Sequence, residues 1–459
     1  VKNSMPQALD GSTICAISTS PGAGGIAVVR VSGPNALEIS SSIFSKTLSS
    51  SNNRGVVFGR VMDGEIIVDE GLALVLCGPG SYTGEDTVEF NIHGSQFIQS
   101  EVVRLLILAG CRLAAPGEFT QRSFLNGKLD LTQAEAVADL IAAEHSGAHR
   151  LAVEQLRGNF SREIVVLRES LIEFAGLLEL ELDFSEEDVE FADRSRFLEL
   201  IEKLLGRVSS LADSFRSGNA IKSGVPIAIL GAPNAGKSTL LNALVGDDRA
   251  IVSDIAGTTR DVIEDTCVIE GTLFRFIDTA GIRDTSDVIE NEGIKRAYAK
   301  ASSAHTVLYM LDASCEDLDS ASLKISSLEL SEETNVIALW NKCDLNDAPL
   351  GQIEECSNSI RISASSGEGI DELKSLLVES HGISESTASL VVTNARHYEA
   401  LVYVKQSLES VKQGLSGETP SDLVAIDVRQ TLHHLGSITG AVHADDILGH
   451  IFSHFCIGK

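Results

Sequence analysis

The sequence contains no apolar run of about 18 residues, so it offers no candidate for a transmembrane helix. Its opening stretch, VKNSMPQALDGS, lacks the apolar segment of a secretory signal. Its eight cysteines lie far apart and include no CxxC pair that would begin a zinc or iron–sulfur site. We therefore expect a cytoplasmic protein without a membrane association, whose thiols are reduced and mostly structural.

Basic residues are also scarce. The chain has 36 Lys and Arg against 65 Asp and Glu, which gives a formal charge of −29. A protein that coats nucleic acid needs a cation for each phosphate it contacts, so this balance excludes that class and leaves only local RNA contacts. At 459 residues, the length predicts about two to four domains.

The periodicity of apolar residues changes several times along the chain. Short β-like runs with Gly and Pro between them predict an α+β domain over residues 12–125. Helical spacing follows, at Ala134, Val137, Ala138 and Ile141 and again at Ile164, Leu167, Leu171, Phe174, Ala175 and Leu178. The acidic run from Asp183 to Phe197 is interpreted as a solvated turn between helices.

From VPIAILG to about Ser380, apolar strands alternate with helices, which is typical of an α/β nucleotide-binding domain. Helical spacing then returns through the last residues. The nucleotide domain is therefore predicted to be inserted in a helical one.

The segment GAPNAGKS, residues 231–238, fits the phosphate-binding pattern GxxxxGK[ST] between a predicted strand and a predicted helix. Main-chain N–H groups and the helix N-terminus can hold phosphates there. Lys237 would reach the β- and γ-phosphate oxygens, and Ser238 would ligate magnesium.

Three later segments match other needs of a guanine nucleotide. In DTAG, Asp278 can hold magnesium through water while the Gly281 amide contacts the γ-phosphate. In NKCD, the Asp344 carboxylate can accept the N1 and N2 protons of guanine, which adenine cannot supply. In ISASSGEG, Ser363 and Ala364 offer a main-chain clamp near the base. The order of these segments predicts a GTPase domain.

The segment SDIAGTTRD, residues 253–261, lies where a mobile switch is expected, with Thr259 as the candidate second magnesium ligand. The glutamine that orients water in Ras-type proteins is replaced by Ile282. Two replacements remain: a carboxylate in the stretch IRDTSDVIENEGIKRA, or a cation held by Asn234 beside the phosphates.

These motifs resemble the MnmE (TrmE) family of tRNA modification GTPases. The likeness includes DTAGIRDTSDVIENEGIKRA, the terminal HADDILGHIFSHFCIGK, and PGAGGIAVVRVSG and GSYTGEDTVEFNIHGS in the first third of the chain. It implies a multidomain α/β and α protein with an α+β, aminomethyltransferase-like folate-binding and dimerisation domain, a discontinuous helical domain and an inserted Ras-like P-loop GTPase domain. The expected bounds are 1–127 for the first, 128–220 and 382–459 for the helical parts, and 221–381 for the GTPase domain.

The resemblance further implies a homodimer that acts on tRNA with an FAD-dependent partner, MnmG (GidA). The two would install an aminomethyl or carboxymethylaminomethyl group at C5 of the wobble uridine, U34, in a potassium-dependent GTPase system. A tetrahydrofolate derivative, in the 5-formyl or methylene form, is the implied one-carbon source. A regulatory GTPase switch in ribosome assembly is the alternative, which a basic RNA-binding appendage would have favoured, and none is evident in the sequence.

The family's site residues can be carried over by motif. Folate would contact Arg30, Glu89, Lys128 and Lys459. Potassium would be held by Asn234, Ser253, Ile255 and Thr258, and magnesium by Ser238 and Thr259. Glu290 would orient the attacking water, and Cys456 is a candidate for a direct chemical role, with burial as a small apolar residue as the alternative.

The predicted GTP-binding residues all lie in the four motifs or in the switch segment, and are Asn234, Ala235, Gly236, Lys237, Ser238, Thr239, Ser253, Asp254, Ile255, Ala256, Gly257, Thr258, Thr259, Asp278, Thr279, Ala280, Gly281, Asn341, Lys342, Asp344, Ser363 and Ala364.

Overall fold

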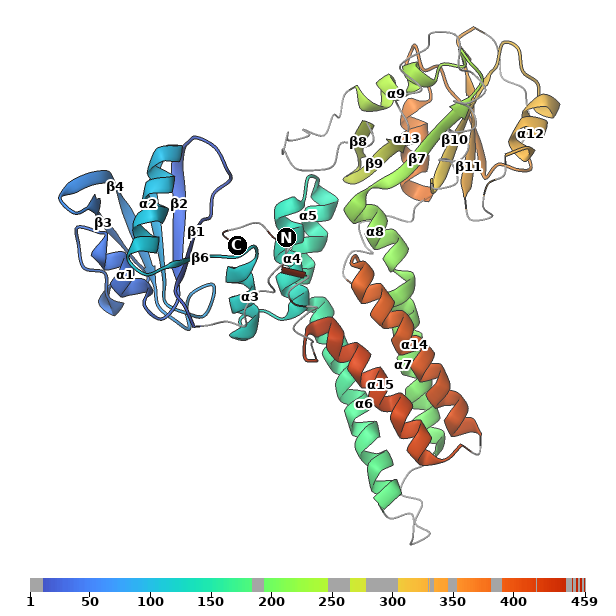
Figure 1. Cartoon of the computed structure of the whole chain (residues 1–459). Helices are drawn as coiled ribbons and strands as arrows, with labels where there is room; N and C mark the ends of the chain where they lie inside the picture. The colour runs from blue at the N-terminus through green and yellow to red at the C-terminus, as the bar shows by residue number, and fades with distance from the viewer. Residues whose placement is uncertain are drawn as a thin grey trace, which may run out of the picture. The chain divides into compact units, whose positions relative to one another are not determined.

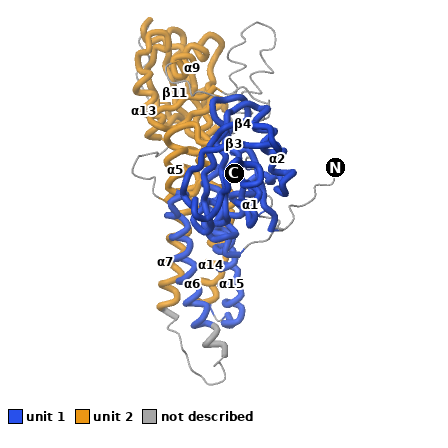
Figure 2. Tube along the Cα trace, turned by 90° about the vertical axis from the view of Figure 1, so that its left-hand side faces the viewer, with its two compact units in different colours: residues 1–138, 155–193, 417–459 blue, residues 139–154, 194–416 orange. Residues whose placement is uncertain are grey.

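The protein divides into two compact units in its computed structural model (Figure 2). Unit 1 comprises residues 1–138, 155–193 and 417–459, and unit 2 comprises residues 139–154 and 194–416. The structure describes residues 11–183, 194–246, 265–277, 304–328, 330, 334–345, 353–380, 390–417, 419–442, 448, 451–452, 455 and 458. Among these residues, no helix combines the length and apolarity needed to cross a membrane.

Unit 1 contains a six-stranded sheet in the order β3-β4-β5-β2-β1-β6, antiparallel except for the β1–β6 pair. Its strands are β1 (Ile14–Ile17), β2 (Gly24–Ser32), β3 (Gly55–Asp63), β4 (Ile66–Leu76), β5 (Thr87–Gly94) and β6 (Arg112–Leu113). Alternate residues of these strands pack against helices α1 (Ala36–Ser42) and α2 (Gln96–Leu108) on one face (Figure 1). A short helix, η1 (Ser50–Asn52), precedes β3.

The helices of unit 1 follow this sheet. They are α3 (Glu118–Leu125), the first part of α4 (Leu131–Ala142), α6 (Asn159–Asp183) and α15 (Ser421–Thr439). Helix α15 packs along α6, so the end of the chain completes a helix pair begun near its middle. The spacing predicted for α6 is confirmed at Ile164, Leu167, Leu171, Phe174 and Leu178, which are all buried, while Ala175 is half-buried.

Unit 2 has a helical part and a nucleotide-binding part. Its helical part contains α7 (Arg194–Asp213), α8 (Phe215–Ser223) and α14 (Ala395–Ser416), together with most of α5 (Ser146–Leu156). Helix α14 packs along α7. The start of α5 approaches the tip of the β8–β9 hairpin closely, because a Cβ on Gly147 would lie 2.5 Å from the carbonyl oxygen of Gly271.

The nucleotide-binding part of unit 2 has a six-stranded sheet in the order β12-β11-β10-β7-β9-β8, in which only β8 is antiparallel. Its strands are β7 (Val225–Gly231), β8 (Asp265–Ile269), β9 (Thr272–Ile277), β10 (Thr306–Asp312), β11 (Asn335–Asn341) and β12 (Asn358–Arg361). Its helices are α9 (Lys237–Val245), α12 (Leu318–Ser326) and α13 (Ile370–Ser380), and apolar cores lie on both faces of the sheet.

This architecture confirms the predicted fold class: an α+β part, helices on both sides of an insertion, and an inserted α/β part. The four domain bounds given above stay predictions. The predicted acidic turn, Asp183 to Phe197, was too long, because residues 194–197 already belong to α7, and residues 184–193 lie outside the described part of the chain.

Candidate functional site

The phosphate-binding segment joins β7 to α9 at the carboxyl edge of the parallel strands, where open α/β sheets bind ligands. Asn234 and Gly236 have positive φ angles of 59° and 102°, so the loop turns sharply before the helix. Gly236 must be glycine, because a Cβ there would collide with the side-chain amide of Asn341. The main-chain N–H groups at the start of α9 are thereby available to an anion.

Lys237 is held inside this loop. Its Nζ donates to the carbonyl oxygens of Gly231 at 2.9 Å and Ala232 at 2.8 Å. Burial lowers the pKa of Lys237, because the charged form loses water there. A bound phosphate would place negative charge beside this ammonium, whose partners here are two neutral carbonyl oxygens. Ser238 and Thr239 follow on the first turn of α9 and are exposed.

Asn341 connects the phosphate loop to the predicted guanine clamp. It is only 3% exposed, its Nδ2 donates to the Ala235 carbonyl at 2.7 Å, and its Oδ1 accepts from the Ala364 amide at 3.0 Å. One side chain therefore ties three predicted nucleotide-binding segments together. Its position at the end of β11 explains this, since β7, β10 and β11 all end at the same edge.

Asp312 is a residue that the sequence analysis missed. It ends β10 directly beside Asn341 in the parallel register, and its Oδ2 accepts from Lys342 Nζ at 2.5 Å. Although burial would raise the pKa of Asp312, hydrogen bonds from Lys342 and Ser314 lower it to about 2. Its place at the end of a parallel strand next to the NKCD segment was the only available signal.

The remaining residues of the predicted base-binding loops lie close by in the chain. Lys342 has a positive φ of 66°, and Asp344 follows it on an exposed turn. Ser363 is fully buried, and its amide donates to the Glu368 carbonyl at 2.9 Å. Because the Asp344 carboxylate is exposed, it pays no desolvation free energy before a base binds.

Many predicted site residues lie outside the described residues. In the GTPase domain these are Ser253, Asp254, Ile255, Ala256, Gly257, Thr258, Thr259, Asp278, Thr279, Ala280, Gly281 and Glu290, and at the end of the chain they are Cys456 and Lys459. Their predicted roles stay predictions.

The second predicted site lies in unit 1. Arg30 on β2 pairs with Glu89 on β5 at 2.8 Å, and these two residues face each other in the antiparallel register. The Arg30 guanidinium carbon lies 5.4 Å from the ring centre of Tyr82 and 5.5 Å from that of Phe119. Arg30 Nη1 also lies 3.4 Å from the carbonyl oxygen of Gly458, near the end of the chain.

Lys128 approaches the same region from the turn after α3. Its Nζ donates to the Pro79 carbonyl at 2.8 Å, in the loop between β4 and β5. Both cations therefore contact the segment 79–85, Arg30 through the ring of Tyr82 and Lys128 through the carbonyl of Pro79. Cations of this kind suit a ligand that carries carboxylates.

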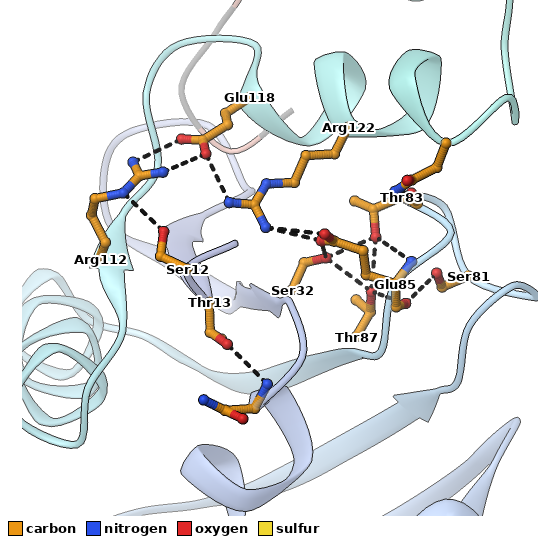
Figure 3. Close-up of polar contacts among 12 residues, drawn as sticks. Ser12, Thr13, Ser32, Ser81, Thr83, Glu85, Thr87, Arg112, Glu118 and Arg122 are labelled. Carbon is orange, nitrogen blue, oxygen red and sulfur yellow. Dashed lines mark hydrogen bonds and ion pairs between the residues drawn. The ribbon is translucent and has the colours of Figure 1, made fainter. Parts of the chain in front are cut away.

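A network of charged side chains lies beneath this loop (Figure 3). Arg122, which is 1% exposed, donates through Nη1 to Glu85 at 3.0 Å and through Nη2 to Glu118 at 2.9 Å. Arg112 contacts Glu118 from the other side at 2.6 Å. Burial opposes ionisation of Glu118, but hydrogen bonds from Arg112, Ala115 and Arg122 lower its pKa.

Comparison with known proteins places these sites in context. A family model described as the MnmE helical domain matches residues 131–456, and one described as the GTP-binding protein TrmE N-terminus matches residues 13–128. The chain is 49% identical to the tRNA modification GTPase MnmE of Parabacteroides distasonis, over 98% of this chain and 100% of that one.

The corresponding protein of Christiangramia forsetii is 48% identical, over 97% of this chain and 99% of that one. Among solved structures, the G domain of the T. maritima FeoB iron transporter is 26% identical, over 34% of this chain and 97% of that one, with a TM-score of 0.25.

Proposed function

The chain belongs to the MnmE (TrmE) family, and from this premise we propose that it hydrolyses GTP as part of a tRNA-modifying complex. The observation that carries the proposal is the bridge made by Asn341, which ties the phosphate loop to the Ser363–Ala364 segment. A nucleotide bound at this edge would contact both ends of the bridge. Because the similar proteins are named tRNA modification GTPases, we expect that the RNA modified by the complex is tRNA.

For nucleotide binding, Lys237 would leave the Gly231 and Ala232 carbonyls and pair with phosphate oxygens. The left-handed turn at Asn234 and the closely packed Gly236 support this, because they open main-chain donors toward the same place. Asp344 would select guanine by accepting hydrogen bonds from the N1 and N2 donors of the base. The exposed hydroxyl of Ser238 is a suitable ligand for magnesium, a hard cation.

For hydrolysis, we propose that the vacancy at Ile282 is filled by a potassium ion and by Glu290. The ion would supply positive charge where negative charge develops on the phosphates. The exposed amide oxygen of Asn234 fits a potassium ligand, with Ser253, Ile255 and Thr258 completing the site and Thr259 joining Ser238 at magnesium. Glu290 would orient the attacking water.

For tRNA modification, we propose that an FAD-dependent partner, MnmG (GidA), acts with this chain at C5 of the wobble uridine. A tetrahydrofolate derivative would supply the one-carbon unit that becomes the aminomethyl or carboxymethylaminomethyl group. The half-buried Arg30 and the exposed Lys128 fit the carboxylates of its glutamyl tail, and the Glu89 carboxylate, which pairs with Arg30, fits its pterin amide. Lys459 is proposed to join this site, and Cys456 is proposed to act near it.

The homodimer is proposed to form on the sheet of unit 1. The face opposite α1 and α2 presents Ile26, Val56, Phe58 and Leu72 to solvent on strands β2, β3 and β4, and Phe58 is 57% exposed. Exposed apolar side chains grouped on one sheet face mark an interaction surface. Arg30 and Glu89 lie on this same face, so a second copy would also enclose the folate site.

The experiment that tests the function is mass spectrometry of wobble nucleosides from cells that lack this protein and that are complemented with wild type or Asp344→Asn. We expect the modified uridines to disappear in the deletion and to return only with wild type. Unchanged modified uridines, together with altered ribosomal particles, would reject the proposal in favour of the ribosome-assembly switch. Phosphate release from GTP by the purified protein tests the hydrolase separately.

A further inference from the structure

An ion network of unit 1 contains the buried Arg122 and Glu118, the half-buried Glu85 and the exposed Arg112, and it connects the elements that carry the folate-site cations (Figure 3). Arg30 lies on β2, its ring neighbours lie on the 79–85 loop and on α3, and Lys128 follows α3. None of these cations belongs to the network. The network instead fixes the positions of the elements that carry or contact these cations, which we call their supports: β2, the 79–85 loop and α3.

Glu85 is the point where the supports meet. Its Oε2 accepts from Arg122 of α3 at 3.0 Å and from Ser32 Oγ at 3.0 Å, and Ser32 is two residues from Arg30 on β2. Ser32 also exchanges a 2.7 Å hydrogen bond with Thr83 of the loop. A single carboxylate therefore joins β2, α3 and its own loop.

Neutral hydrogen bonds run parallel to the Glu85–Arg122 pair. Ser123 donates to the Tyr82 carbonyl at 2.8 Å, Asn126 donates to the Thr83 carbonyl at 2.8 Å, and Tyr82 bonds Thr120 at 2.8 Å. These contacts hold the loop against α3 without charge. The ion pairs add a fixed direction to this contact, because the planar guanidinium fork of Arg122 directs Nη1 to Glu85 and Nη2 to Glu118.

The network is poorly explained by stability alone. Removing a buried arginine and carboxylates from water costs free energy that apolar residues of similar size would not. In addition, Arg122 Nε is buried and has no hydrogen-bond partner among the described residues. An orphaned buried donor on a 1% exposed side chain indicates that its placement serves something besides folding.

We propose that Glu85 and Arg122 are positioning residues for the ligand site of unit 1, and that they set the spacing of Arg30 and Lys128 for a ligand with two carboxylates. The inference rests on the proposed folate function and deepens it. Without the pair, the loop and α3 would keep their neutral contacts, while the two cations would be held at variable spacing. Each cation would then lose more freedom when a ligand binds.

The test compares 5-formyltetrahydrofolate with an analogue that lacks the glutamyl tail, by calorimetry on the full-length protein. The variant Glu85→Gln, Arg122→Met removes the pair with side chains of similar volume. We expect it to bind the complete ligand about tenfold or more weakly, and the tail-less analogue with nearly the wild-type affinity. Arg122→Lys, which keeps the charge but loses the fork, should lie between the two.

The matched control is Glu101→Gln, Arg104→Met, which removes an ion pair on the exposed surface of α2 in the same unit. It should bind both ligands as wild type does. Thermal unfolding monitors folding, and the single Glu85→Gln variant carries the test if the double variant does not fold. A merely structural role would lower the melting temperature and the fraction of competent sites without separating the two ligands.

The outcomes distinguish the inference from its premise. If wild type binds neither ligand, the folate proposal fails and the positioning role fails with it. If wild type binds 5-formyltetrahydrofolate and the variant binds it equally well, only the positioning role is overturned. An equal loss for both ligands would also overturn it, because the effect would not depend on the carboxylates.

Discussion

Replacing Asn341 with alanine should weaken nucleotide binding and destabilise the nucleotide-binding part of unit 2. The variant loses the 2.7 Å bond to the Ala235 carbonyl and the 3.0 Å bond from the Ala364 amide. Each bond contributes about 0.5–1.5 kcal/mol, so the combined loss is about 1–3 kcal/mol. If it fell wholly on affinity, the GDP dissociation constant would rise about 5-fold to 150-fold.

The loss is expected to be shared between two measurements. The bonds exist before any ligand binds, so part of it lowers the urea midpoint of unfolding. The rest appears in the dissociation constant of a fluorescent GDP, because the nucleotide must then hold the two loops in place by itself. Asn358→Ala, at an exposed asparagine that begins β12, is the matched control and should change neither quantity.

A variant that kept both the wild-type affinity and the wild-type urea midpoint would refute this reasoning. Asn341→Asp separates the two bonds, since its carboxylate still accepts from Ala364 but cannot donate to Ala235. We expect it to bind GDP more weakly than wild type, because two acceptors would then face each other.

Three further predictions concern the proposed nucleotide site. Asp344→Asn should weaken GTP binding by about 1–3 kcal/mol and favour xanthine nucleotides, and equal GTP affinity in a competition assay would reject the clamp. GTP turnover should be faster in potassium than in sodium at equal ionic strength, and Asn234→Ala should lose that stimulation. Glu290→Ala should lose turnover while keeping nucleotide affinity. Indistinguishable rates in the two salts would contradict the cation site. The pKa of Asp312 is lowered to about 2 from an ordinary value of 3.8, so its stabilisation is present above about pH 4 and is lost as the pH falls through 2. Wild type should therefore exceed Asp312→Asn in urea stability at pH 7 and approach it near pH 2, and a constant difference would refute the assignment.

Local patterns predicted the elements of the fold well, because their signals lie in consecutive residues. The apolar run VPIAILG became β7, the segment after GAPNAG became α9, and NVIALW became most of β11. A strand, β2, rather than a helix follows PGAGG, so that glycine-rich segment offers no helix N-terminus to a phosphate. Each of these outcomes follows from spacing and turn residues alone.

The supports of the unit 1 site could not be predicted in this way. Arg122 meets a carboxylate 37 positions earlier in the sequence, and an isolated arginine normally lies on the surface. Asp312 was missed for a related reason, since its partner Lys342 comes 30 positions later, directly after the neighbouring strand. The sheet register brings Asp312 and Lys342 together, whereas the packing of α3 against the 79–85 loop brings Arg122 to Glu85.

The division of the chain into alternating segments has a consequence for the order in which the protein can fold during synthesis. Helix α6 of unit 1 is made before residues 194–416, but its partner α15 begins only at Ser421. The nucleotide-binding part of unit 2, from β7 to α13, is continuous and leaves the ribosome earlier. Because domains fold as their residues become available, this part can be complete while α6 still exposes the apolar surface that α15 will cover.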